Sequence, residues 1–282
     1  PWCSDAQLMF YNKKLFEKAG TTPEEFCNSF EGLKQACEKL KKAGVAPMSF
    51  ANKEGYMNEW YFFQAIGSIF KDNQDYMENW AKAPNYMDPR VIDVVRNYKY
   101  AFDNGFFYEG QTLDFGSSYL QSFMDQKTAA CFCGMSFYDK IVESVPIEDV
   151  GLMPWPSLSE GGKARVYTAP LVLGVASFTQ HPKEAVAVID MVTSNEWAEI
   201  IYNIYNMIPA NTRWKFTENT KAPLVGREVE LIRKDSIIYP YNYSISESLD
   251  TVYKDMQLVL SGEMAPEDWC RKMQDVSSKA AK

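Results

Sequence analysis

The stretch PWCSDAQLMFYNKKLFEKAG, residues 1–20, predicts a strand that runs directly into a helix. The apolar run Leu8–Tyr11 is typical of a buried strand, and Asn12 is a turn residue. Apolar residues at helical spacing follow until Gly20, which is expected to end the helix. A domain seldom opens on one of its interior strands, and the chain has no initiator methionine. We therefore expect further residues upstream of this sequence.

The composition of the chain excludes several classes of protein. It has 282 residues, of which 46% are apolar and 15% are aromatic, which is enough for a substantial core. No stretch approaches the roughly 18 consecutive apolar residues that a membrane span requires. The 29 basic and 37 acidic residues give a net charge of -8 without a dense basic cluster. Neither nucleic acid nor an anionic membrane is therefore an expected partner.

Strands and helices are expected to alternate along most of the chain. Thr22 and Pro23 begin a helix that the apolar spacing extends without a break to Gly44, whereas residues 71–87 are expected to form a loop. The other expected strands are 46–50, 128–133, 150–153 and 166–176, and the main further helices are 88–104, 182–192, 195–204, 223–233, 245–260 and 266–278. This order predicts an α/β domain with a mixed, mostly parallel sheet flanked by helices and a helical C-terminus.

The six cysteines follow no disulfide or metal-binding pattern. A structural zinc site needs four ligands, and the chain has a single histidine, His181, at a predicted helix start. We predict that the thiols are mostly free and that the protein holds neither a metal nor another cofactor. The cysteines are Cys3, Cys27, Cys37, Cys131, Cys133 and Cys270.

Several segments carry a resemblance to a known family. They include YNKKLFEKAG (11–20), FMDQKTAA (123–130), SFTQHPKEAVAVIDMVTS (177–194) and NMIPAN (206–211). In this order they resemble motifs of the family 1 extracellular solute-binding proteins, the sugar-binding components of bacterial ABC importers. The resemblance covers essentially the whole chain and extends to the maltodextrin-binding proteins of that family.

The resemblance implies a periplasmic-binding-protein-like (type II) fold, in which two α/β lobes hold a ligand between them. Residues 1–169 would supply the hinge strand and most of lobe two, residues 170–220 a crossover segment that packs on lobe one, and residues 221–282 the helical completion of lobe two. Most of lobe one would then be absent from this sequence. Apolar residues of the crossover segment would then lack their usual sheet, so they are expected to repack, to meet a partner chain or to be exposed. They include Val186, Ile189, Val192, Trp197 and Ile201.

A sugar site combines flat aromatic rings with carboxylates and amides, and ligands of open α/β sheets lie beyond the carboxyl ends of strands. The loop FANKEGYMNEW (50–60) resembles the stretch in which maltodextrin-binding proteins contact sugar, here through Glu54 and Tyr56. Asp5 matches an acidic cleft position, and Phe137 lies near the position of a stacking tryptophan. Trp60 has helical spacing and could equally belong to the core. The candidate ligand-binding residues are Asp5, Asn52, Glu54, Tyr56, Trp60, Ser136, Phe137, Tyr239 and Tyr241.

The resemblance implies a non-catalytic protein that binds a sugar or oligosaccharide for ABC-type import. Its expected partners are permease subunits, and its expected place is the surface of a Gram-positive cell, held by a lipid anchor. With half of the cleft missing, we predict weak or undetectable sugar binding by this chain alone. Two alternatives remain open: a carbohydrate-active enzyme that uses Glu54 and Glu59 as acid and base, and a sensor or scaffold that docks through residues 170–220. That exposed surface would also favour a dimer.

Overall fold

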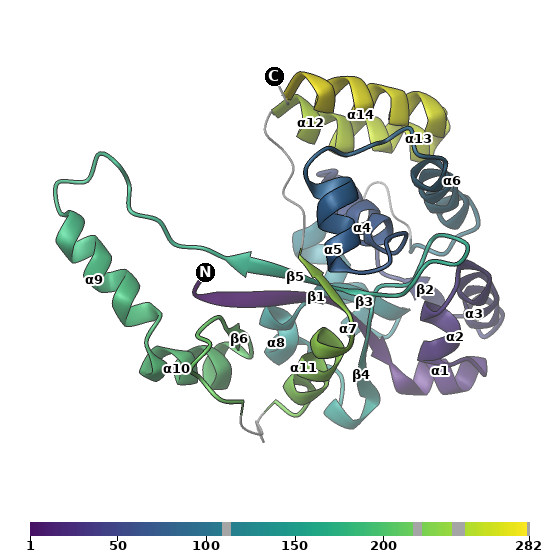
Figure 1. The fold of residues 1–282 in the computed structure, drawn as a ribbon. Coiled ribbons are helices and arrows are strands. Elements are labelled where there is room, and N and C mark those ends of the chain that lie inside the picture. Colours follow the sequence, from purple (N-terminus) through teal and green to yellow (C-terminus); the bar gives the residue numbers. More distant parts are fainter. Residues whose placement is uncertain (109–113, 217–221, 239–245, 281–282) are drawn as a thin grey trace.

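The long central strand β1 (Cys3–Asn12) organises the fold. The computed structural model describes residues 1–108, 114–216, 222–238 and 246–280, and Figure 1 shows a layered α/β body from which one helical segment projects. Leu8, Met9 and Phe10 of β1 are all fully buried, although their side chains alternate between the two faces of the sheet. Both faces are therefore covered, as the continuous apolar run indicates.

β1 is long enough to pair with four strands, two along each edge. Along one edge it pairs with β6 and then β3, and along the other with β5 and then β4, always antiparallel. β2 is parallel to β3, and β7 is parallel to β5. Among the described strands, only β1 runs against the others, which confirms the mixed, mostly parallel sheet. The partners are β2 (Ala46–Met48), β3 (Thr128–Gly134), β4 (Val150–Met153), β5 (Val166–Leu171), β6 (Ile208–Pro209) and β7 (Ser236–Ile238).

Helices pack around this sheet, and the chain ends in helices as predicted (Figure 1). α11 contacts β4, β5 and β7, whereas α3 contacts β2 and α7 contacts β3. The α-helices are α1 (Lys13–Ala19), α2 (Pro23–Cys27), α3 (Phe30–Lys42), α4 (Tyr56–Gly67), α5 (Asn73–Tyr76), α6 (Pro89–Asp103), α7 (Leu120–Met124), α8 (Tyr138–Val142), α9 (Pro182–Val192), α10 (Asn195–Tyr205), α11 (Leu224–Lys234), α12 (Ser246–Asp250), α13 (Met256–Ser261) and α14 (Pro266–Ala280). Short π or 3₁₀ segments are η1 (Met77–Ala81), η2 (Phe115–Tyr119), η3 (Met135–Phe137), η4 (Ile147–Asp149) and η5 (Thr251–Asp255).

The buried apolar residues form one large core that runs through the body. Trp80, Trp155 and Trp269 are among its largest fully buried side chains. All six cysteines are free and buried, which confirms the prediction of free thiols. Of the helices in the described ranges, none is both long and apolar enough to cross a membrane.

The single helix predicted from Thr22 to Gly44 is wrong, because the chain breaks it into α2 and α3. Thr22 accepts a hydrogen bond from the Glu25 backbone as predicted, but Ser29 then caps a second helix by accepting one from the Gly32 backbone. A Cβ on Gly32 would lie 2.3 Å from the Glu25 carbonyl oxygen, so this glycine allows the two helices to fold tightly together. The predicted loop at residues 71–87 is also wrong.

Residues 71–87 contain α5 and η1, which are held by aromatic burial. Tyr76, Trp80 and Tyr86 are almost completely buried. Trp80 contacts Phe70 and Tyr86, with ring centroids 6.0 and 5.0 Å apart. Asp72 caps α5 by accepting a hydrogen bond from the Asp75 backbone.

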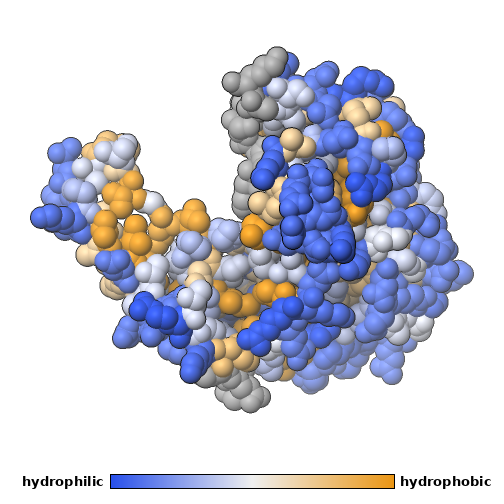
Figure 2. Space-filling model, in the orientation of Figure 1, coloured by the Kyte–Doolittle hydropathy of each residue, from blue (hydrophilic) through white to orange (hydrophobic). Residues whose placement is uncertain are grey.

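An exposed arm, defined here as residues 172–205, projects from the end of β5 (Figure 1). Val172 is 70% and Phe178 is 84% exposed, and no residue of α9 is buried. Figure 2 shows the hydrophobic surface of this arm facing open space. Ile201 is repacked within this chain: it is buried with Cys3 and Met207, and Trp197 packs against the same small cluster. The arm is therefore anchored at α10 and uncovered along α9.

Candidate functional site

The loop before α4 is fixed by contacts with the C-terminal helices. Gly55 has φ +83°, and a Cβ there would lie 2.9 Å from Tyr253 Cβ, so the turn needs glycine. Asn58 Nδ2 donates to the Tyr253 carbonyl at 3.1 Å, and Gln257 Nε2 donates to the Asn52 carbonyl. The start of α4, with its aromatic side chains, is thereby held in place.

Four half-buried rings form a continuous aromatic patch, defined here as Tyr56, Trp60, Phe115 and Phe137. Phe115 lies at its centre: its ring centroid is 5.4 Å from Tyr56, 5.7 Å from Trp60 and 6.1 Å from Phe137. Tyr56 and Trp60, one turn apart on α4, meet edge to face at 5.4 Å. α4, η2 and η3 therefore each supply rings to one partly exposed surface.

Buried polar contacts support the aromatic patch from below. Phe115 stacks on Tyr119 at 5.0 Å. The Tyr119 hydroxyl donates to the Phe132 carbonyl at 2.6 Å and accepts from the Phe132 backbone N–H at 3.1 Å. Trp60 contacts the Phe132 ring at 6.1 Å. The rings thus rest on β3 through hydrogen bonds inside the core.

Asp5 lies on β1 where β3 ends. A Cβ on Gly134 would lie 2.2 Å from Asp5 Oδ2, and the Met135 backbone N–H donates to the carboxylate. Asp5 Oδ1 has no hydrogen-bond partner among the described residues. Burial raises the pKa of Asp5 to about 6, against the opposing effect of the Met135 hydrogen bond. The carboxyl group of Asp5 therefore carries a buried oxygen, Oδ1, that has no hydrogen-bond partner among the described residues.

The structure brings several candidate residues together and separates others. Tyr56, Trp60 and Phe137 meet through Phe115, and Ser136 is exposed on the segment that follows the Asp5 contact. Glu54 is exposed beside Tyr56, where its carboxylate contributes, after burial, to a raised Tyr56 pKa. Asn52 is fully buried. Tyr239 and Tyr241 lie outside the described residues.

Phe115 is the residue that sequence reasoning missed. It lies in the π-helical segment η2, in a stretch rich in glycine and serine that shows no periodicity. A π-helical turn marks functional sites often enough to draw attention, but such a turn is not visible in the sequence. The one feature of the sequence that could have indicated Phe115 is an aromatic residue directly before a run of small residues, Gly116–Ser118.

Glu54 and Glu59, the acid and base of the enzyme alternative, do not form a catalytic pair in this structure. Glu59 is buried and accepts a hydrogen bond from the Tyr253 hydroxyl at 2.6 Å, whereas Glu54 is exposed. Glu59 therefore holds the helix start in place. Within the described residues, no group of three or more His, Cys, Asp or Glu side chains is placed to hold a metal ion.

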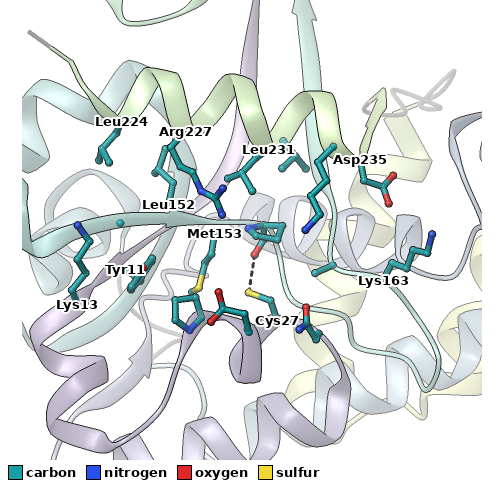
Figure 3. Close-up of a pocket in the computed structure, with 18 of the residues that line it drawn as sticks. Tyr11, Lys13, Cys27, Leu152, Met153, Lys163, Leu224, Arg227, Leu231 and Asp235 are labelled. Atoms are coloured by element: carbon teal, nitrogen blue, oxygen red, sulfur yellow. Dashed lines mark hydrogen bonds between the residues drawn. The ribbon is translucent and has the colours of Figure 1, made fainter. Parts of the chain in front are cut away.

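A separate hollow of about 690 Å³ lies between α11, β4 and α2 (Figure 3). It reaches β1 at Tyr11, whereas Asp5 and Gly134 meet near the opposite end of the strand. None of the residues in the aromatic patch lines it. The hollow and the patch are therefore two distinct places on the molecule.

Comparison with known proteins places the fold. The chain matches a chitin oligosaccharide binding protein over all of its length and 71% of that chain, with 20% identity and a TM-score of 0.80. A Bacillus licheniformis sugar transporter in complex with stachyose matches 99% of this chain and 73% of that chain, with 17% identity and a TM-score of 0.79. The GacH receptor of Streptomyces glaucescens, solved with and without acarbose, matches all of this chain and 70% of that chain, with 17% identity and a TM-score of 0.76.

These structures share the periplasmic-binding-protein-like fold that the sequence predicted. No curated protein matches the chain. The profile of the bacterial extracellular solute-binding proteins matches residues 1–199, well over half of the sequence. That family binds solutes and does not catalyse their conversion. The chain belongs to the bacterial extracellular solute-binding proteins.

Proposed function

We propose that this protein binds a sugar or oligosaccharide at the aromatic patch and Asp5. The observation that carries the proposal is the group of four adjacent, partly exposed rings beside β3. Asp5 lies where that strand ends and has a carboxyl oxygen without a hydrogen-bond partner among the described residues. The apolar C–H face of a sugar ring stacks on such rings, and its hydroxyls donate to carboxylates. Ser136 and Glu54 supply further polar groups at the rim.

The relatives of the same fold support a carbohydrate as the ligand. Their names and complexes include a chitin oligosaccharide, stachyose and acarbose. At 17–20% identity the likeness shows the fold only, so the ligand class of this chain rests on its own residues. The rings of Tyr56, Trp60, Phe115 and Phe137 are suited to that class.

In this proposal the ligand serves ABC-type import, and permease subunits are the partners of the whole protein. Residues 1–169 and 221–282 form lobe two, and residues 170–220 cross to a first lobe. The uncovered apolar face of the arm supports a packing partner for this segment. The chain spans 70–73% of the length of the solved relatives. A lipid anchor on a Gram-positive surface is part of the same proposal.

Titration of the chain with a panel of maltose, raffinose and chitin oligosaccharides tests the site. We expect weak binding, because in this proposal the first lobe supplies roughly half of the contacts with the sugar. In ¹H–¹⁵N NMR spectra the Gly134 and Gly55 amides should shift with sugar. Trp60→Ala and Phe115→Ala should each weaken binding about fivefold or more, since an aromatic contact contributes about 1 kcal/mol beyond its buried area.

The matched control is Phe178→Ala, which removes an exposed ring from the arm, far from the patch in sequence. It should leave sugar binding unchanged. Binding that survives both Trp60→Ala and Phe115→Ala would contradict the site. Micromolar or tighter binding by the chain alone would contradict the missing lobe.

A further inference from the structure

The hollow beside α11 exposes the backbone of a strand. Gly151, Leu152, Met153 and Pro154 line it in succession, although successive side chains of a strand point to opposite faces. Leu152 and Met153 have almost completely buried side chains. Residues from both faces of β4, and Pro154 just after it, therefore reach the hollow, as is expected beside the edge of a strand. Among the described strands β4 pairs with β1 alone, so this edge has no strand beside it.

The walls of the hollow combine an apolar floor with positive charge. Leu224 and Leu231 of α11 add apolar surface to that of β4. Lys13, Lys163, Arg227 and Lys234 supply four cationic groups against two carboxylates, Glu24 and Asp235. Asp235 is already paired with the fully buried Arg165 at 2.5 Å. The hollow is therefore positively charged in a chain whose net charge is -8.

Arg227 is the cation best placed to contact a ligand. Figure 3 shows its guanidinium group pointing from α11 into the hollow, above the strand that carries Leu152 and Met153. Arg227 forms an ion pair with Glu230 at 3.1 Å, and both side chains are about half or more exposed. Solvent weakens such a surface pair, so the guanidinium can exchange it for a ligand carboxylate or phosphate.

We propose that this hollow is a second binding site, which takes a small organic anion. The carboxylate or phosphate of the ligand pairs with Arg227, and its hydrocarbon part lies on the apolar floor. A volume of about 690 Å³ falls within the range of small-molecule sites. The inference does not depend on sugar binding, because no residue of the aromatic patch lines the hollow.

Benzoate and its neutral analogue benzyl alcohol provide a matched pair of probes for the chain at fixed ionic strength. In ¹H–¹⁵N NMR spectra we expect benzoate to cause saturable shifts of the Gly151 and Gly162 amides, which line the hollow. Gly134, beside Asp5, and Gly174, on the arm, should not shift. Benzyl alcohol should bind at least tenfold more weakly, because it lacks the charge that Arg227 recognises.

Three variants locate the site. Arg227→Gln should weaken benzoate binding by about tenfold or more, because it removes the charge-assisted hydrogen bonds between the guanidinium group and the carboxylate. Arg213→Gln is the control, because it removes the same charge from an exposed residue outside the hollow. Leu224→Trp should also weaken binding by filling the hollow without changing its charge.

Several results would overturn the proposal. They are an absence of shifts at Gly151 and Gly162, shifts confined to Gly134 or Gly174, equal binding of benzyl alcohol, or equal effects of Arg227→Gln and Arg213→Gln. Inorganic phosphate that competes as well as benzoate does would reduce the site to general charge attraction and overturn it too. If Leu224→Trp does not fold, the arginine pair and the two probes still decide the question.

Discussion

Arg165 joins three parts of the body through one buried guanidinium group. It pairs with Asp235 at 2.5 Å, donates to the Phe70 carbonyl at 2.7 Å and also donates to the Lys71 carbonyl. Its side chain is fully buried. The end of the α4 segment, β5 and the start of β7 are thereby tied together.

Arg165→Met should lower the free energy of unfolding by about 3 kcal/mol, because it leaves two carbonyls and a partly buried carboxylate without their donor. Urea denaturation monitored by circular dichroism measures the loss. Lys254→Met is the control: its pair with Asp250 is 73% and 62% exposed, and the expected loss is below about 1 kcal/mol. Equal losses in the two variants would contradict the role assigned to Arg165.

Glu228 carries a buried carboxyl group that lies close to Asp5 and Ala6 of β1. It is fully buried on α11, where the Ala6 backbone N–H lies close to its carboxyl group. Burial, and then the nearby Asp5 carboxylate, raise the pKa of Glu228 well above its usual range, although the Ala6 backbone N–H opposes the rise. The protein therefore keeps Glu228 protonated at a pH where the unfolded chain would release the proton.

This raised pKa predicts how stability depends on pH. The folded state binds more protons than the unfolded state, so the contributions of Asp5 and Glu228 are complete below their unfolded pKa values and are lost as pH rises. For Asp5 the loss falls between about pH 4 and pH 6. At neutral pH the free energy of unfolding is lower by up to about 3 kcal/mol because of the raised pKa of Asp5. For Glu228 the loss continues to higher pH.

The gain in the free energy of unfolding that Glu228→Gln produces should therefore be larger at pH 7 than at pH 4. Asp5→Asn should show the same trend over the lower part of this range. Urea denaturation at several pH values gives the difference from the unaltered protein. A Glu228→Gln difference that is constant from pH 4 to pH 8 would refute the raised pKa.

At the residue scale, most of the aromatic patch could be predicted from the sequence, but its central residue, Phe115, could not. Tyr56, Trp60 and Phe137 could be singled out because loops after strands collect ligand residues. Phe115 could not, because its place depends on how η2 lies against Tyr119 and Phe132. Such a contact joins segments that the sequence does not show to be adjacent. The binding roles of all these residues stay predictions.

At the scale of elements, the break between α2 and α3 depends on one hydroxyl group. Ser29 Oγ accepts from the Gly32 backbone at 3.0 Å and so begins α3. Ser29→Ala should cost about 1 kcal/mol, the usual loss for a helix N-cap, whereas Ser29→Asp should retain most of the stability. Thermal unfolding of both variants measures this. An alanine variant as stable as the aspartate variant would show that the cap is dispensable.

The elements that sequence reasoning found are those whose signals are local. Asn12, Thr22 and Asp88 cap their helices with their own side chains, and Gly20 ends α1 at φ 66°. The missed elements depend on distant partners. α5 and η1 lack a strong pattern of their own and form because Tyr76, Trp80 and Tyr86 are buried by Phe70 and Trp269.

At the scale of the whole molecule, the uncovered arm predicts self-association. Val172, Phe178, Val186, Val188 and Met191 are all about half or more exposed on a segment that leaves the body. Light scattering after size exclusion should show a concentration-dependent dimer or larger species, because contiguous apolar surface of this kind attracts a partner.

The double variant Val172→Ser with Phe178→Ser should shift the protein towards the monomer. Tyr100→Ser, which removes an exposed aromatic residue from the body, is the control and should change nothing. A monomer at every concentration in the unaltered protein would exclude association through the arm.

The central position of β1 also governs the order in which the sheet can assemble. The strands that pair with residues 3–12 lie much further along the chain, at 128–134, 150–153, 166–171 and 208–209. Each pairing closes a long loop, and loop entropy is lost before the contacts compensate for it. During synthesis the apolar run Leu8–Phe10 is made early but can be covered only late. We therefore expect folding to be slow and to be completed only after residues 208–209 have been synthesised.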